Sequence, residues 1–144
     1  MKKIAIGCDH AGFELKEKII VFLKSKNIEV IDKGCYSNER VDYPDFGHAV
    51  ANQVIQDNDT YGILLCGSGN GIAMSANKHH GIRAALCWHE EISVLARQHN
   101  DANILVLPAR FLDDTQAFAI IEAYLNTPFE GGRHLDRIHK IDCV

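Results

Sequence analysis

A short apolar run that ends in a cysteine and a glycine-rich loop constrains the fold of this chain most strongly. Residues 63–65 are Ile-Leu-Leu, a continuous apolar segment typical of a strand that is buried on both faces of a parallel sheet. Cys66 follows, and residues 67–71 then read Gly-Ser-Gly-Asn-Gly before a helical pattern begins. A buried strand, a glycine turn and a helix in direct succession indicate an α/β fold.

The rest of the chain repeats this alternation of short apolar runs and amphipathic segments. Strands are predicted over 3–8, 28–32, 61–66, 81–87 and 104–107, and helices over 13–26, 43–56, 70–77, 89–99, 113–125 and 132–142. Such βαβ units predict a five-stranded, mostly parallel sheet with helices on both faces. We expect one domain over residues 1–144, whose last helix, about 132–142, packs on a partner subunit.

The composition is that of an ordinary globular protein that binds neither nucleic acid nor membranes. The net charge is −4 at pH 7, which predicts no basic surface for nucleic acid or anionic lipid. The first apolar run meets Asp9 and His10 too early for a signal peptide or a membrane span. The five cysteines include no C-x-x-C pair, and this odd number favours free thiols in a reducing cytosol. We therefore expect a cytoplasmic protein.

The glycine loop after Cys66 has the features of an anion site. Glycines let a ligand approach the backbone closely, and the N–H groups at the start of a helix hold anions, including a transient oxyanion. A helix N-terminus also favours thiolate over thiol, so Cys66 could act as a base there. The alternative is a scaffold, with a turn that eases helix–sheet packing and a buried, inert cysteine. The loop alone leaves both interpretations open.

Polar residues follow other strands at their carboxyl ends. Asp9 and His10 come directly after the first strand, and Arg110 follows the fifth. Ligands of parallel sheets bind beyond the carboxyl ends of the strands, so we expect these residues to share one pocket with Cys66. The alternative for the first pair is an N-cap aspartate beside a solvated histidine.

Two further groups lie elsewhere in the chain. His99 and Asn100 end a predicted helix, where His99 is either a polar C-terminal residue or a proton donor near neutral pH. Arg133 and Arg137 are four residues apart, so a helix places both guanidinium groups on one face, where they suit a phosphate or simply face solvent. His79 and its neighbour His80 lack suitably spaced partner ligands, so we expect a surface loop and no metal site.

Six ordered blocks of sequence carry a resemblance to a known family. The chain resembles the sugar-phosphate isomerase family, which holds the type B ribose-5-phosphate isomerases and the galactose- and allose-6-phosphate isomerases. The resemblance implies a Rossmann-like three-layer α/β/α sandwich, a homodimer or tetramer with the active site at the subunit interface, a phosphorylated sugar substrate, and no metal or organic cofactor. The matching blocks are IGCDHAGF (6–13), DYP (42–44), CGSGNGI (66–72), ANK and GIRA (76–78 and 81–84), RQHNDAN (97–103) and FEGGRH (129–134).

The resemblance also implies roles for individual residues. Cys66 matches the catalytic base and His99 the residue that assists opening of the sugar ring. One branch of the family instead carries a glutamate base just after the loop, but residues 72–75 here are Ile-Ala-Met-Ser. Ser68 stands where other members have threonine and keeps the hydroxyl. The matched substrate-binding positions are Asp9, His10, Gly67, Ser68, Gly69, Asn70, Gly71, Asn100, Arg110, Arg133 and Arg137.

These roles predict an aldose–ketose isomerase of the pentose phosphate pathway that interconverts ribose 5-phosphate and ribulose 5-phosphate. His99 would protonate the ring oxygen, Cys66 would move the proton from C2 to C1, and Ser68 would relay a proton between the oxygens of a cis-enediolate. An allose- or galactose-6-phosphate isomerase remains the alternative substrate. Two other classes also stay open: a thiol hydrolase with His99 as the base for Cys66, and a dinucleotide-binding module, although G-x-G-x-G departs from G-x-G-x-x-G.

Overall fold

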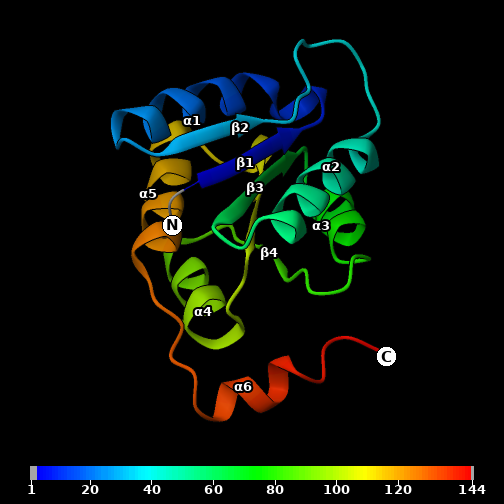
Figure 1. Ribbon diagram of the computed structural model, residues 1–144. Helices are drawn as coiled ribbons and strands as arrows, with labels where there is room; N and C mark the ends of the chain where they lie inside the picture. Colours follow the sequence, from blue (N-terminus) through cyan, green and yellow to red (C-terminus); the bar gives the residue numbers. More distant parts are fainter. Residues whose placement is uncertain (1–2, 144) are drawn as a thin grey trace.

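A five-stranded parallel sheet lies between two layers of helices in the computed structural model, which describes residues 3–143 (Figure 1). The strand order is β2-β1-β3-β5-β4, and every neighbouring pair is parallel. The predicted α/β sandwich with a five-stranded sheet is therefore confirmed. The strands are β1 (Lys3–Cys8), β2 (Glu29–Asp32), β3 (Thr60–Cys66), β4 (Ala84–Leu86) and β5 (Ile104–Pro108).

The chain changes direction across the sheet between β1 and β3. From β1 it moves outward to β2, and it then returns to form β3 on the other side of β1. Open α/β sheets bind ligands at such a switch point, beyond the carboxyl ends of the two strands. The carboxyl ends of β1 and β3 are Cys8 and Cys66, so the residues that follow these cysteines occupy the favoured position.

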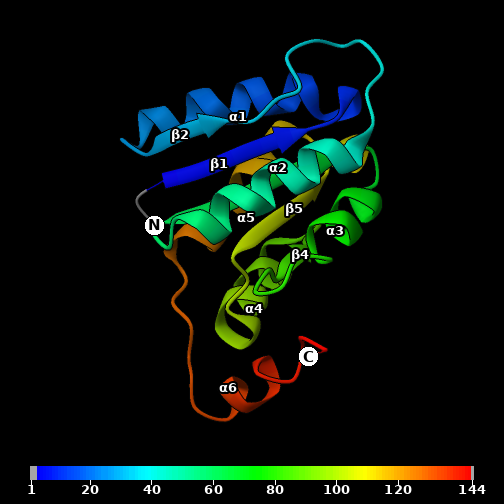
Figure 2. The same ribbon diagram turned by 45° about the vertical axis from the view of Figure 1, so that its right-hand side comes forward.

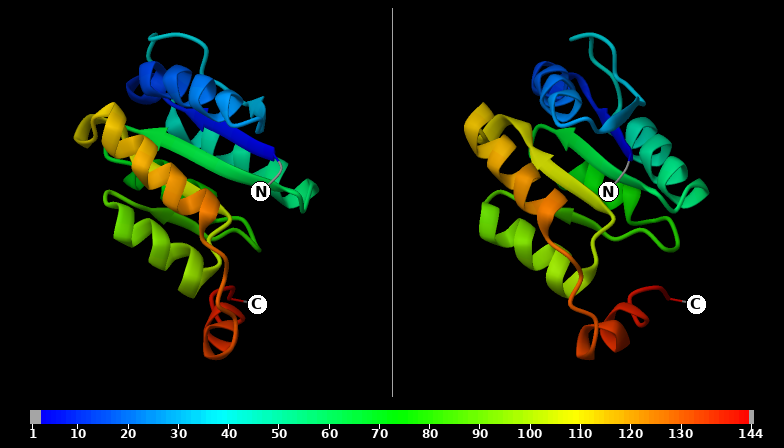
Figure 3. Two further views of the ribbon diagram at one scale, coloured as in Figure 1. Left: turned by 90° about the vertical axis from the view of Figure 1, so that its left-hand side faces the viewer. Right: turned by 60° about the vertical axis from the view of Figure 1, so that its left-hand side comes forward.

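The helices cover the two faces of the sheet unequally. Helices α1, α4 and α5 lie on one face, and α2 and α3 lie on the other (Figures 2 and 3). The helices are α1 (Phe13–Ser25), α2 (Tyr43–Gln56), α3 (Asn70–Ala76), α4 (Glu90–Asn100), α5 (Asp114–Asn126) and α6 (Arg133–Ile138), with single 3-10 turns η1 (His10–Gly12) and η2 (Ala109–Phe111). Among residues 3–143, none of the helices is long and apolar enough to cross a membrane.

The central strands are buried on both faces, which explains their unbroken apolar runs. Along β3, Ile63 and Leu65 join the core beneath α1, α4 and α5, whereas Leu64 and Cys66 join the core beneath α2 and α3. This alternation follows from the two-residue period of a strand. It directs the side chain of Cys66 towards α3, the helix that begins just after it.

Most predicted boundaries agree with the structure within two residues, but two elements are shorter than predicted. Strand β4 begins at Ala84 instead of residue 81, because Arg83 donates its backbone N–H to the side-chain Oδ1 of Asn103 and not to a ladder partner. The last helix, predicted over about 132–142, ends at Ile138. It projects from the body of the molecule at the end of a linker (Figure 1).

Candidate active site

Strand β3, a three-residue turn and the start of α3 build the glycine loop. Gly69 has φ +79°, a left-handed conformation that L side chains rarely adopt, and a Cβ atom there would lie 2.4 Å from Leu86 Cδ1. The Ser68 hydroxyl accepts a hydrogen bond from the backbone N–H of Asn70 at 3.3 Å. These constraints place the first turn of α3 immediately after Cys66, as the sequence predicts.

The loop leaves backbone donors available beside Cys66. The first hydrogen bond of the helical ladder runs from the Ala73 N–H to the Gly69 carbonyl at 3.2 Å. The N–H groups of the preceding turn have no partner within the helix, and such groups bind anions. The side chain of Cys66 is 5% exposed, so its thiol lies at the edge of the core and not in open solvent.

Asp9 and His10 lie next to this loop because β1 pairs with β3. The Asp9 N–H donates to the Leu65 carbonyl at 3.2 Å, and its carboxylate accepts from the Ala11 N–H at 3.0 Å. Asp9 is thus an N-cap, as the alternative interpretation proposed, and also a neighbour of the loop. His10 Nδ1 accepts from the Val41 N–H at 3.3 Å. Because that ring nitrogen is the acceptor, a neutral His10 carries its proton on Nε2 and can donate it to a ligand.

Arg110 extends the same edge of the sheet. Its backbone N–H donates to the Gly67 carbonyl at 3.1 Å, which ties η2 to the glycine loop. Its guanidinium lies against Gly67, where a Cβ atom would come within 3.1 Å of Nη1. Gly67 therefore permits a close approach of positive charge to the loop, which adds to the attraction for an anion.

Tyr43 belongs to this edge as well, although no role for it was predicted from the sequence. It is the first residue of α2, and its ring covers Gly71, where a Cβ atom would lie 2.5 Å from Cε1 and Cζ. Tyr43 is 41% exposed, so this residue lies at the surface beside the loop. The sequence signal for this residue is the Asp-Tyr-Pro block at 42–44, which matches the family but does not indicate what Tyr43 contacts.

The other predicted site residues lie at the opposite end of the sheet. Helix α4 starts beyond the carboxyl end of β4 and returns to the amino end of β5 (Figure 1). His99 and Asn100 lie on its last turn, whereas Cys66 lies at the carboxyl end of β3, so the two groups are far apart. The length of β5, Ile104–Pro108, alone separates the two ends by about 13 Å. Arg133 and Arg137 on α6 are at the same distant end as His99 (Figure 2). One chain does not bring the two halves together.

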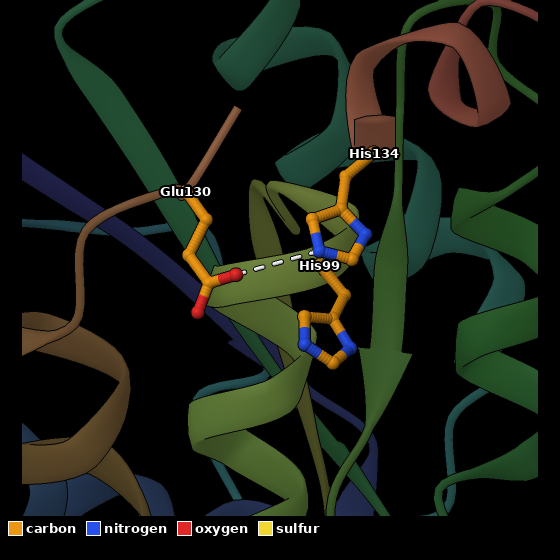
Figure 4. A group of neighbouring side chains, drawn as sticks. All are labelled: His99, Glu130 and His134. Carbon is orange, nitrogen blue, oxygen red and sulfur yellow. Dashed lines mark ion pairs between the residues drawn. The ribbon is translucent and has the colours of Figure 1, made fainter. Parts of the chain in front are cut away.

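At that distant end, His99 is part of a cluster of three side chains (Figure 4). The rings of His99 and His134 are stacked, with centroids 4.3 Å apart and an interplanar angle of 15°. Glu130 Oε2 lies 3.4 Å from His134 Nε2. Neither Glu130 nor His134 was assigned a role from the sequence.

A cavity of about 550 Å³ lies on the same side of the molecule as this cluster. Its lining includes Asn100, residues 77–80 and the C-terminal segment 141–143. It is therefore adjacent to the second half of the predicted site and not to Cys66. The loop around Cys66 lies at the other end of the sheet.

Burial changes the acidity of two other cysteines, Cys8 and Cys87. Burial raises the pKa of the Cys87 thiol to about 12. Burial, together with the neighbouring Cys35, raises the pKa of Cys8, whose sulfur lies 3.8 Å from that of Cys35. These groups stay protonated and cannot act as bases near neutral pH.

The adjacent histidines lie in a loop, as predicted. His79 Nε2 is 2.7 Å from His48 Nδ1, and His80 Nδ1 is 3.4 Å from Asp142 Oδ2. Partial burial and His48 together lower the pKa of His79. The two neighbouring rings thus contact different partners and point to different places, which does not favour a shared metal ion.

Known proteins resemble this chain in sequence and in fold. The chain matches the family model described as ribose/galactose isomerase over residues 4–141. Ribose-5-phosphate isomerase B of Escherichia coli K12 is 46% identical over 144 residues, 100% of this chain and 97% of that protein. The crystal structure of a ribose 5-phosphate isomerase from Thermotoga maritima has a TM-score of 0.94 and 55% identity over 97% of both chains. Ribose-5-phosphate isomerase B of Mycoplasma genitalium with bound ribulose-5-phosphate has a TM-score of 0.93 and 45% identity over 96% of this chain and 93% of that chain.

Proposed function

The chain belongs to the ribose/galactose isomerase family, and on this basis we propose that it interconverts ribose 5-phosphate and ribulose 5-phosphate through a cis-enediolate. The observation that carries the proposal is the position of Cys66 beside a loop of backbone donors and Arg110. A sugar phosphate brings both a carbon acid and a dianion to such an edge. The relative from Escherichia coli is named ribose-5-phosphate isomerase B, and the structure from Mycoplasma genitalium contains bound ribulose-5-phosphate.

Cys66 is the base in this proposal. As thiolate it removes the proton from C2 of the open-chain aldose and returns it to C1, and negative charge collects on the two oxygens of the cis-enediolate. The N–H groups of residues 67–71 stabilise this charge, and one such donor contributes about 3–4 kcal/mol in comparable oxyanion sites. Ser68 relays a proton between the two oxygens, because its hydroxyl can both donate and accept.

The remaining groups bind the substrate from two sides. Asp9 and His10 on the loop side accept and donate hydrogen bonds to the sugar hydroxyls. Arg133 and Arg137 bind the phosphate with their guanidinium groups, four residues apart on α6. His99 donates the proton that opens the furanose ring, and Asn100 contacts the opened chain beside it.

A second copy of the chain completes the site. Because His99 and the α6 arginines lie about 13 Å or more from Cys66 within one chain, a homodimer supplies them from the partner subunit. In a two-fold dimer, the Cys66 end of each subunit faces the His99 end of its partner, so the dimer forms two equivalent sites. This arrangement also argues against a thiol hydrolase in which His99 activates Cys66 of the same chain. A tetramer would arise from two such dimers.

The deciding experiment measures carbon-acid chemistry at the site. The wild-type protein is expected to convert ribose 5-phosphate with a higher kcat/KM than allose 6-phosphate or galactose 6-phosphate, and to exchange the C1 hydrogen of ribulose 5-phosphate with D₂O. Cys66→Ala is expected to abolish both turnover and exchange while ribulose 5-phosphate still binds, measured by calorimetry. Near-normal turnover in Cys66→Ala would show that another group is the base.

A further inference from the structure

The histidine that opens the ring is held against a second histidine, His134. The two rings are nearly parallel, with an interplanar angle of 15° and centroids 4.3 Å apart (Figure 4). His134 is 4% exposed, whereas His99 is only partly buried. The buried ring thus forms a fixed surface on which the accessible ring rests.

The backbone explains why His134 has this place. The Glu130 N–H donates to the Gln98 carbonyl at 3.1 Å, which ties the linker to the last turn of α4. Gly131 and Gly132 then take φ values of +67° and +57°, and α6 begins directly after them. This turn brings Glu130 and His134 to the same side, with Glu130 Oε2 3.4 Å from His134 Nε2.

Two histidines and a glutamate are also a common set of metal ligands, but their arrangement here favours another role. A histidine nitrogen binds a metal ion in the plane of its ring, and two such nitrogens must converge on one point. Stacked rings with an interplanar angle of 15° direct their in-plane lone pairs side by side and not towards a common ion. The cluster therefore fits a support for one ring better than a metal site.

We propose that His134 is a positioning residue that fixes the ring plane of His99 for opening of the sugar ring, and that Glu130 holds His134 in place. This inference rests on the proposed function, because only ring opening requires His99 to direct its N–H at one oxygen. The stacked surface restricts rotation of the His99 side chain, so its proton is presented in one direction. Errors of about 1 Å in such geometry reduce rates by about a hundredfold.

The step that His134 would support is the opening of the furanose ring of ribose 5-phosphate. His99 donates its proton to the ring oxygen as the bond between C1 and that oxygen breaks, and the C1 hydroxyl releases its proton to water, which leaves the open-chain aldehyde. Ribulose 5-phosphate has no furanose form, because its C5 oxygen carries the phosphate. Exchange of its C1 hydrogen therefore needs the base at Cys66 but not the acid at His99.

This difference separates the role of His134 from a general structural role. His134→Ala is expected to lower the turnover of ribose 5-phosphate by between about tenfold and a hundredfold, while C1 hydrogen exchange on ribulose 5-phosphate in D₂O stays within twofold of wild type. His134→Phe keeps a flat ring without its nitrogens and is expected to recover most of the turnover. Glu130→Gln should cause a smaller loss than His134→Ala. His139→Ala, an exposed histidine just beyond α6, is the matched control and should change neither rate.

Two results would overturn the proposal. If His134→Ala lowers turnover and exchange in parallel, the residue supports the fold of α6 and not the direction of the His99 proton. If His134→Ala and His134→Phe both retain full turnover, the stack has no role in ring opening. A wild-type protein without turnover or exchange would instead overturn the proposed function itself, so the two failures are distinguishable.

Discussion

Two inactive variants of this protein should restore activity when they share a dimer. Cys66→Ala removes the proposed base at one end of the sheet, and His99→Asn removes the proposed acid at the other. Because about 13 Å of β5 separates these ends within one chain, each site of the proposed dimer takes its base from one subunit and its acid from the other. In a mixed dimer, both substitutions then fall in one site, and the second site is fully wild-type.

The expected activity follows from counting sites. Equal amounts of the two variants, co-expressed so that subunits pair at random, give half mixed dimers, and each of these has one intact site of two. The mixture should therefore show about a quarter of the wild-type turnover of ribose 5-phosphate, although either variant alone shows almost none. A tetramer built from two such dimers gives the same fraction. Separate affinity tags on the two variants allow the mixed dimer to be purified and assayed directly.

A chain that carries both substitutions is the matched control. Mixed with wild type at equal amounts, it should leave about a quarter of the activity, because every mixed dimer then has one defect in each site. A site built within one chain would leave half of the activity in this control and none in the mixture of single variants. Either of those outcomes would refute a site shared between subunits.

Two further predictions concern single residues. Gly71→Ala places a Cβ atom 2.5 Å from the Tyr43 ring, so the ring must move away from the loop. We expect kcat/KM for ribose 5-phosphate to fall at least about tenfold, which corresponds to about 1.4 kcal/mol. Unchanged kinetics would exclude Tyr43 from the site. Burial raises the pKa of the Cys87 thiol from 9.0 to about 12. The neutral thiol therefore makes its full contribution to the free energy of unfolding below pH 9. This contribution is lost as the pH rises from 9 towards 12, by up to about 4 kcal/mol. Denaturant unfolding at pH 8 and pH 10.5 should show a lower free energy of unfolding at the higher pH. The decrease between the two pH values should be smaller in Cys87→Ala than in the wild-type protein.

Much of the fold could be predicted because its local signals agree with one another. The apolar run before Cys66 is long enough for a strand buried on both faces, and the glycines after it permit only a tight turn. Helix α2 begins and ends at its predicted residues, Tyr43 and Gln56. Strand β4 was predicted too long, because hydrophobicity cannot show that Asn103 takes the place of a neighbouring strand at Arg83.

The division of the site into two halves was accessible from topology alone. In a parallel sheet, each strand ends at the edge where the next helix begins, and that helix ends at the other edge. Cys66 ends a strand and His99 ends a helix, so the two must face opposite edges. The contacts of His134 were not accessible in this way, since they depend on two consecutive glycines with positive φ that reverse the linker.

A site shared between two copies also explains how an open edge can protect a reactive intermediate. Water that reaches a cis-enediolate can protonate it at the wrong carbon or face, so the site must be covered during the reaction. Within one chain, Arg110 and Ser68 remain exposed at this edge of the sheet. The proposed partner brings both the cover and the missing groups in one step. Activity should then depend on assembly, because a separated monomer holds its base too far from its own acid and phosphate ligands to form a site.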